Sequence, residues 1–179
     1  MEFPEVVLVD STHGKNANRY KLFSFVVQYV FRKGQYAHHV LVYSEQKDDL
    51  RHVVKSFKEN NPVWSNIRLF MTDKTMHDKN FLREEFPEAR QLLCQWHAIT
   101  WKQETRLTPD QRKDVKSIMR LLVYAKNPKS VTTTRGLGND PAHELYKSFL
   151  TYWDCSKDEW VTYLHGGVPH LTNNTNNSI

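Results

Sequence analysis

The sequence is poor in cysteine, with only Cys94 and Cys155 among its 179 residues. Two thiols cannot build the disulfide framework of a small secreted domain, and they fit a reducing compartment. The first ten residues carry Glu2 and Glu5 without a basic start, so they predict no secretory signal. No run approaches about 18 apolar residues, which excludes a membrane-spanning helix. We therefore expect a nuclear or other intracellular protein with no membrane partner.

Common catalytic signatures are missing as well. The sequence contains no Gly-rich phosphate loop, no G-x-S-x-G elbow and no H-E-x-x-H motif. It does contain many aromatic residues, namely five Trp, nine Phe and eight Tyr. Disordered chains lack the aromatic residues that offset the entropy cost of ordering. The aromatic content therefore predicts a folded chain. Its length predicts one domain, with room for an inserted sub-domain.

The positive charge is concentrated in one segment. Residues 101–135 hold nine Lys or Arg against three Asp or Glu, a net +6 in a chain whose total is +5. A basic segment suits a polyanion, so DNA is the expected partner. The candidate contact residues are Arg112, Lys113, Lys116 and Arg120. The alternative is a solvated helix face, and charge alone does not separate the two.

The first part of the sequence predicts strands followed by a helix. Apolar, β-branched runs at residues 6–9, 22–31 and 37–43 predict three strands, the last two joined as a hairpin. Residues 47–60 then change period. Their apolar members recur at the spacing of one helical face and are Leu50, Val53, Val54 and Phe57.

Three further elements complete the predicted sheet. Residues 67–71 predict a fourth strand, residues 80–86 a short helix stopped by Pro87, and residues 89–94 a fifth strand. The resulting order is β-β-β-α-β-α-β, which is typical of a mixed α/β sheet.

The later part of the sequence predicts helices. Thr108-Pro109 opens one helix, Asp140-Pro141 opens another, and residues 156–159 form a capping box for a third. We therefore divide the chain into a core at residues 1–104, a helical insertion at 105–165 and a polar tail at 166–179.

Two carboxylates stand where predicted strands end. Asp10 follows the first strand and Asp73 follows the fourth, so the two would meet at one edge if these strands are neighbours. Magnesium sites use one or two carboxylates with water and substrate phosphate oxygens, and paired ions drive phosphoryl transfer. We predict a Mg²⁺ (or Mn²⁺) site there. The alternatives are a turn residue at Asp10 and a helix N-cap at Asp73.

Cys94 and His97 form a C-x2-H pair. This spacing can place a thiolate and an imidazole on one zinc ion, with Cys155, His165 or His170 as further ligands. A packed, structural pair is the favoured alternative, because free cysteine is commonly buried as a small hydrophobe.

These residues together resemble the catalytic domain of Mutator-like (MULE) transposases. Residues 10–16, with sequence DSTHGKN, are similar to the family's first-acid motif, and residues 70–73, FMTD, to its second. Residues 86–97 resemble its "FP-x-A … C-x2-H" segment. The same domain occurs in SWIM-type zinc-finger proteins that look like domesticated relatives.

The resemblance implies an RNase H-like fold with a helical insertion, and DDE chemistry in which three acids hold two Mg²⁺ ions. Asp10 and Asp73 would be the first two acids. The family's third acid, a Glu, follows an Asn-rich stretch much like residues 173–179, where this sequence ends. We therefore expect a truncated or domesticated copy that is inactive in DNA cleavage and strand transfer.

Three functions stay open at this point. The first is a DDE transposase catalytic core. The second is a non-catalytic nucleic-acid-binding or regulatory module that uses the basic segment. The third is a zinc-stabilised interaction module centred on Cys94 and His97. Each is compatible with self-association into a homo-oligomer.

Overall fold

A computed structural model of the chain describes residues 5–12, 17–28, 34–73, 79–100, 108–129 and 153–165. These residues belong to two compact units that divide between Cys94 and Gln95. The division predicted between residues 104 and 105 falls outside the described ranges and stays a prediction. Within those ranges, no helix has both the length and the apolar character needed to cross a bilayer.

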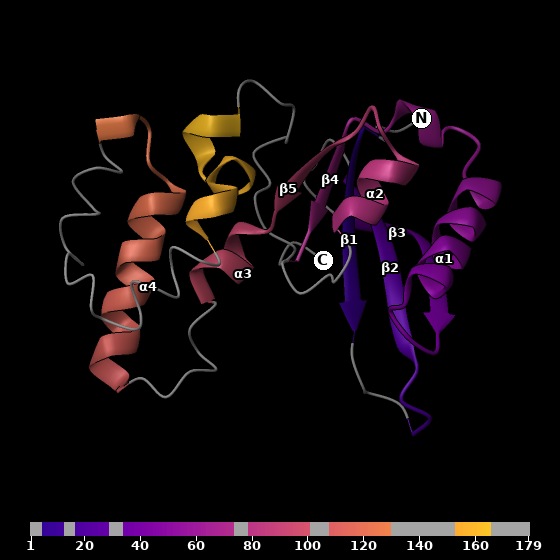
Figure 1. Ribbon diagram of the computed structural model, residues 1–179, viewed down its shortest axis with the longest axis horizontal. Coiled ribbons are helices and arrows are strands. Elements are labelled where there is room, and N and C mark those ends of the chain that lie inside the picture. Colours follow the sequence, from indigo (N-terminus) through magenta and orange to yellow (C-terminus); the bar gives the residue numbers. More distant parts are fainter. Residues whose placement is uncertain are drawn as a thin grey trace. The chain divides into compact units, whose positions relative to one another are not determined.

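The first unit is built on a five-stranded mixed sheet with the order β3-β2-β1-β4-β5. Its strands are β1 (Val6–Thr12), β2 (Lys21–Gln28), β3 (Gly34–Val42), β4 (Leu69–Thr72) and β5 (Arg90–Leu93). The first three strands pair antiparallel, whereas β1 with β4 and β4 with β5 pair parallel (Figure 1). The predicted α/β class and element order are confirmed.

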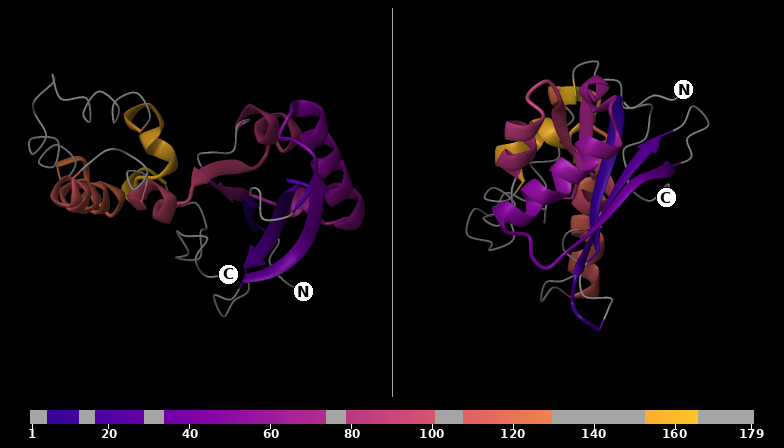
Figure 2. Two further views of the ribbon diagram at one scale, coloured as in Figure 1. Left: turned by 90° about the horizontal axis from the view of Figure 1, so that it is seen from below. Right: turned by 90° about the vertical axis from the view of Figure 1, so that its right-hand side faces the viewer.

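Two helices cover one face of this sheet, α1 (Lys47–Asn60) and α2 (Lys79–Glu85) (Figure 2). The predicted bounds of α1 are correct, and its apolar stripe is buried as expected. The stripe packs into one cluster with side chains of α2 and of the central strands, including Val9, Phe25, Phe70 and Phe81. The opposite face carries a smaller cluster of Leu8, Val26, Met71 and Cys94.

The short 3₁₀ turn η1 (Trp64–Asn66) follows α1 and packs near its end. Lys58 of α1 places its ammonium 4.4 Å from the Trp64 ring centroid and 4.6 Å from that of Phe86. The same ammonium donates to the backbone carbonyl and the carboxylate of Glu85, at 2.8 and 3.0 Å. This cation therefore ties the C-terminal ends of α1 and α2 together.

Strand β1 is longer than the sequence predicted. The prediction ended the strand at Asp10, but pairing with β2 continues through Thr12, opposite Leu22. Antiparallel pairing with a long hairpin strand extends β1 on that side. On the other side, its parallel pairing with β4 stops at Val9. The predicted end of β1 is therefore too early on the side where β1 pairs with β2. On the side where β1 pairs with β4, it agrees with the end of the pairing.

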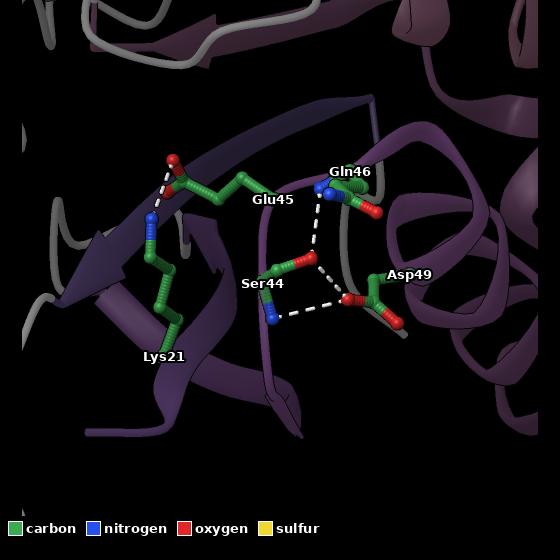
Figure 3. A network of polar contacts seen from close by, with 5 residues as sticks. All are labelled: Lys21, Ser44, Glu45, Gln46 and Asp49. Carbon is green, nitrogen blue, oxygen red and sulfur yellow. Dashed lines mark hydrogen bonds and ion pairs between the residues drawn. The ribbon is translucent and has the colours of Figure 1, made fainter.

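A polar network fixes the passage from β3 into α1 (Figure 3). The backbone N–H of Ser44 donates to the Asp49 carboxylate at 3.0 Å, and the Ser44 hydroxyl donates to the same oxygen. The backbone N–H of Gln46 donates to that hydroxyl at 3.2 Å. Next to it, Lys21 and Glu45 form an ion pair of 2.8 Å. Asp49 thereby supports the start of α1, where the helix dipole favours an anion.

The second unit is helical in its described part, as the sequence predicted. It contains α3 (Gln95–Thr100), α4 (Pro109–Val123) and the 3₁₀ segments η4 (Asp154–Glu159) and η5 (Thr162–His165). Helix α4 begins at Pro109, where the capping sequence placed it. The helix predicted after Asp140 lies outside the described residues.

The capping box predicted at residues 156–159 is wrong. Ser156 interrupts η4 with dihedral angles of φ −125° and ψ 28°, and its buried hydroxyl makes no hydrogen bond with any described residue, so it caps no helix there. Two buried indoles hold this segment in its tighter form. The Trp160 indole N–H donates to the Trp153 carbonyl at 3.0 Å, and the two rings meet edge to face at 5.6 Å. Tertiary packing of these rings overrides the local capping pattern.

A buried hydrogen-bond chain connects three parts of the second unit. The Gln95 amide, which is fully buried, donates to the Trp160 carbonyl at 3.3 Å and to the Thr162 hydroxyl at 3.0 Å. That hydroxyl donates in turn to the Val123 carbonyl at 2.7 Å. Thr162 is therefore both donor and acceptor between the starts of α3 and η5 and the end of α4.

Replacing Thr162 with Val should lower the free energy of unfolding of the second unit by about 1–3 kcal/mol, because the Val123 carbonyl loses its donor and the Gln95 amide loses an acceptor. Urea denaturation followed by Trp fluorescence measures this change. Ser117→Ala is the matched control, since it removes an exposed hydroxyl bonded to the Lys113 carbonyl and should change stability by less than about 0.5 kcal/mol. Equal effects of the two substitutions would contradict the prediction.

His38 of β3 points toward α1. Its Nε2 lies 3.0 Å from the Ser56 hydroxyl oxygen. Its ring packs beside those of Phe25 and Phe57, with centroid distances of 6.3 and 6.1 Å. Burial lowers the pKa of His38 below its ordinary value of 6.5, and the neighbouring His39 lowers it further.

The free energy of unfolding should therefore fall as pH decreases below about 6.5. The histidine of the unfolded chain takes up a proton there, whereas the folded His38 does so only at lower pH. Chemical denaturation at a series of pH values measures this dependence. At acid pH the free energy of unfolding should fall less steeply with decreasing pH in His38→Gln than in the parent. Identical slopes in the two proteins would show that His38 does not carry this pH dependence.

Candidate functional site

The register of β1 and β4 brings the two predicted acids to neighbouring positions. Val9 pairs with Thr72 in the parallel ladder, and Asp10 and Asp73 are the next residues on each side. Neighbouring strands lie about 4.8 Å apart, so the two backbones deliver their carboxylates at the same edge of the sheet. Both residues are half-buried, which leaves them reachable by solvent.

The structure rules out the simpler role for Asp10. This residue lies within β1 and pairs with Ser24, so it is not a turn residue. The N-cap alternative for Asp73 stays open, because residues 74–78, which precede Lys79 of α2, lie outside the described ranges.

The residue types at this edge fit a hard divalent cation. Carboxylate oxygens are preferred ligands of Mg²⁺, which commonly takes one or two of them and fills its other positions with water or phosphate oxygens. Asp10 and Asp73 supply that number. Among the described residues, no group of three or more His, Cys, Asp or Glu side chains is placed to hold a metal ion. His13 lies outside the described ranges.

The two members of the C-x2-H pair belong to different units. Cys94 is buried in the apolar cluster with Leu8 and Met71, and its backbone N–H donates to the Thr72 carbonyl at 2.8 Å. His97 lies on α3, half-buried, with its ring centroid 4.9 Å from that of Trp96. Cys155 is exposed, His165 is buried, and His170 lies outside the described residues. A zinc ion at this pair stays a prediction.

The predicted basic residues lie on α4. Lys113 and Arg120 are exposed and Lys116 is half-buried. Arg112 belongs to the same helix, but its side chain is not among those described. Because an α-helix turns 100° per residue, positions 113, 116 and 120 fall within one narrow sector. Buried Val115 and Leu122 lie far around the helix from Lys113 and Arg120. Half-buried Lys116 instead lies beside the buried Val123.

One further polar pair escaped sequence reasoning. Ser24 of β2 pairs with Asp10 on one side and with His39 of β3 on the other. The Ser24 hydroxyl oxygen lies 3.0 Å from His39 Nδ1. A row of polar residues therefore crosses three strands on the face opposite α1. The one local signal for the pair was a serine within an apolar strand. The row of polar residues follows only from the register of the three strands.

Sheet order and sequence comparison agree on the family. The order β3-β2-β1-β4-β5, with an antiparallel hairpin beside parallel strands, is consistent with an RNase H-like fold. A family model described as "Zinc finger SWIM domain-containing protein 1/3, RNaseH-like domain" matches residues 1–92 of the 179. An RNase H-like domain points to a function related to nucleic acid. The chain belongs to the family of the RNase H-like domain of zinc finger SWIM domain-containing protein 1/3.

Proposed function

We propose that this chain is a nucleic-acid-binding module that contacts the phosphate backbone through the basic side of α4. The observation that carries the proposal is the placement of Lys113 and Arg120 on the exposed side of that helix, with half-buried Lys116 at the border of the buried stripe. Charge alone left the solvated-face alternative open. Three cations that converge in one sector favour a polyanion, because each can neutralise one phosphate along a strand.

The surroundings of this basic side support the same partner. Tyr124 follows Arg120 by about one turn and is 53 % exposed, so an aromatic ring borders the cations. Phosphate contacts of this kind position a duplex without reading its sequence. The expected ligand is therefore DNA of any sequence, and a nuclear or other intracellular location follows from the proposal.

Duplex binding should weaken steeply with salt, because each phosphate contact releases counterions. Replacing Lys113, Lys116 and Arg120 with Gln should reduce the slope of log K against log salt by about 0.9 for each lost contact. Fluorescence anisotropy with a labelled duplex at several salt concentrations measures this slope.

The matched control changes the same charge elsewhere in the second unit. Lys126, Lys129 and Lys157 are all exposed, and their replacement with Gln also removes three positive charges. If the control lowers the slope as much as the α4 variant, the contribution is general charge rather than the basic side of α4. Binding that does not depend on salt would contradict the proposal.

A second candidate function is metal-dependent phosphodiester chemistry of the DDE type, as in Mutator-like transposases. The register that aligns Asp10 with Asp73 specifically favours it. A divalent cation held there would supply Lewis-acid polarisation of a phosphate oxygen. Asp10 and Asp73 would hold it from two neighbouring strands, with water and phosphate oxygens completing its coordination.

The pair should bind Mn²⁺ saturably, and Asp10→Asn should abolish that binding, because an amide is a weaker ligand without charge. Isothermal titration calorimetry of the two proteins tests this. Asp110→Asn is the matched control, since Asp110 is an exposed carboxylate on α4 and should leave the titration unchanged. Heats that are equal in all three proteins, or absent from the parent, would remove this candidate.

A further inference from the structure

The sheet face opposite α1 presents a row of exposed aromatic and apolar side chains on β3 and beside it. Leu41 is 63 % exposed, Tyr36 52 % and Tyr43 77 %. We call this surface the tyrosine platform and define it as Tyr20, Tyr36, His39, Leu41 and Tyr43. Large apolar side chains that are exposed together on one sheet face are typical of an interaction surface, whereas single scattered ones are not.

A β-bulge brings these side chains to one face. Side chains alternate along a strand, so His38, Val40 and Val42 face the core while His39 and Leu41 face outward. Tyr36 is three residues from His39 and would point inward in a regular strand. The register shifts between Phe25 and Val26, which leaves Ala37 as the extra residue and pairs Tyr36 with Val26. Tyr36 therefore joins His39 on the outer face.

The rings of the platform are held in place before any partner arrives. The Tyr36 and His39 ring centroids lie 4.6 Å apart, and the Ser24 hydroxyl lies 3.0 Å from His39 Nδ1. At the other end, Tyr20 and Tyr43 meet edge to face at 6.2 Å. The network of Ser44 and Asp49 fixes the backbone directly after Tyr43 (Figure 3). Little entropy is lost when such rings receive a ligand.

The charge of the segment that carries the platform favours one kind of partner. Residues 11–44 hold no Asp or Glu and five Lys or Arg, namely Lys15, Arg19, Lys21, Arg32 and Lys33. Of these, Lys21 is paired with Glu45. A segment with cations and aromatic rings but no acids complements a polyanion that carries flat, apolar groups. Single-stranded nucleic acid has both properties, because its unpaired bases expose faces that stack on aromatic side chains.

We propose that the tyrosine platform binds single-stranded nucleic acid, with unpaired bases stacked on Tyr36 and His39 and on Tyr43. The row Asp10–Ser24–His39 lies across the same face, so a strand on the platform would run beside the two carboxylates. This inference rests on the proposed nucleic-acid function for the class of partner only, since α4 belongs to the other unit.

The test measures anisotropy of a labelled oligothymidylate of about 12 nucleotides, a length within the range bound by single-strand modules. All proteins carry the α4 substitutions described above, so the basic helix does not contribute. Replacing Tyr36 and Tyr43 with Ala should weaken binding by about fivefold to a hundredfold per lost stack. The control variant, with Phe at both positions, keeps the rings and should bind within about twofold of its parent.

Equal loss in the Ala and Phe variants would overturn stacking, and absence of oligothymidylate binding in the parent would overturn the platform as a single-strand site. A second measurement needs no substitution. Ultraviolet crosslinking of the unmodified chain to an oligonucleotide containing 5-iododeoxyuridine, followed by peptide mapping, should modify Tyr36 or Tyr43. Crosslinks confined to the second unit would overturn the proposal. Because duplex binding reports on α4 alone, the two proposals can fail separately.

Discussion

The pairing of β1 with β4 on one side and with β2 on the other determines where the polar residues Asp10, Asp73 and Ser24 lie. Val6, Val7, Leu8 and Val9 are all buried, so this strand can only be central. One register then aligns Asp10 with Asp73, the other extends the line to Ser24, and the β2–β3 register extends it to His39. A slip of one residue would turn these polar groups into the core, so burial of the strand enforces the placement.

Part of this placement could be read from the sequence, because local patterns have local causes. A short apolar run that ends in an acid indicated both Asp10 and Asp73. The helical spacing from Leu50 to Phe57 gave α1 its correct bounds. The parallel ladder that joins the two acids is different. It links segments distant in the chain, and no local pattern shows which strands become neighbours.

The tyrosine platform could not be predicted for a related reason. The run at residues 37–43 has apolar or aromatic residues on both of its faces, so alternation does not show which side is covered. The extra residue at Ala37 then moves Tyr36 to the other face, and nothing in the local sequence marks that shift. In the second unit the six residues of α3 are too few to show a helical period, and the packing of Trp153 on Trp160 replaced the helix predicted there.

The bulge at Ala37 also affects the open side of the sheet. Strand β3 is the last strand on its side, and a regular edge strand offers a continuous row of N–H and C=O groups to any other extended chain. An inserted residue breaks the even spacing of that row and increases the local twist. A strand rich in Tyr, Val and Leu can therefore remain exposed while resisting the edge-to-edge association that leads to aggregation.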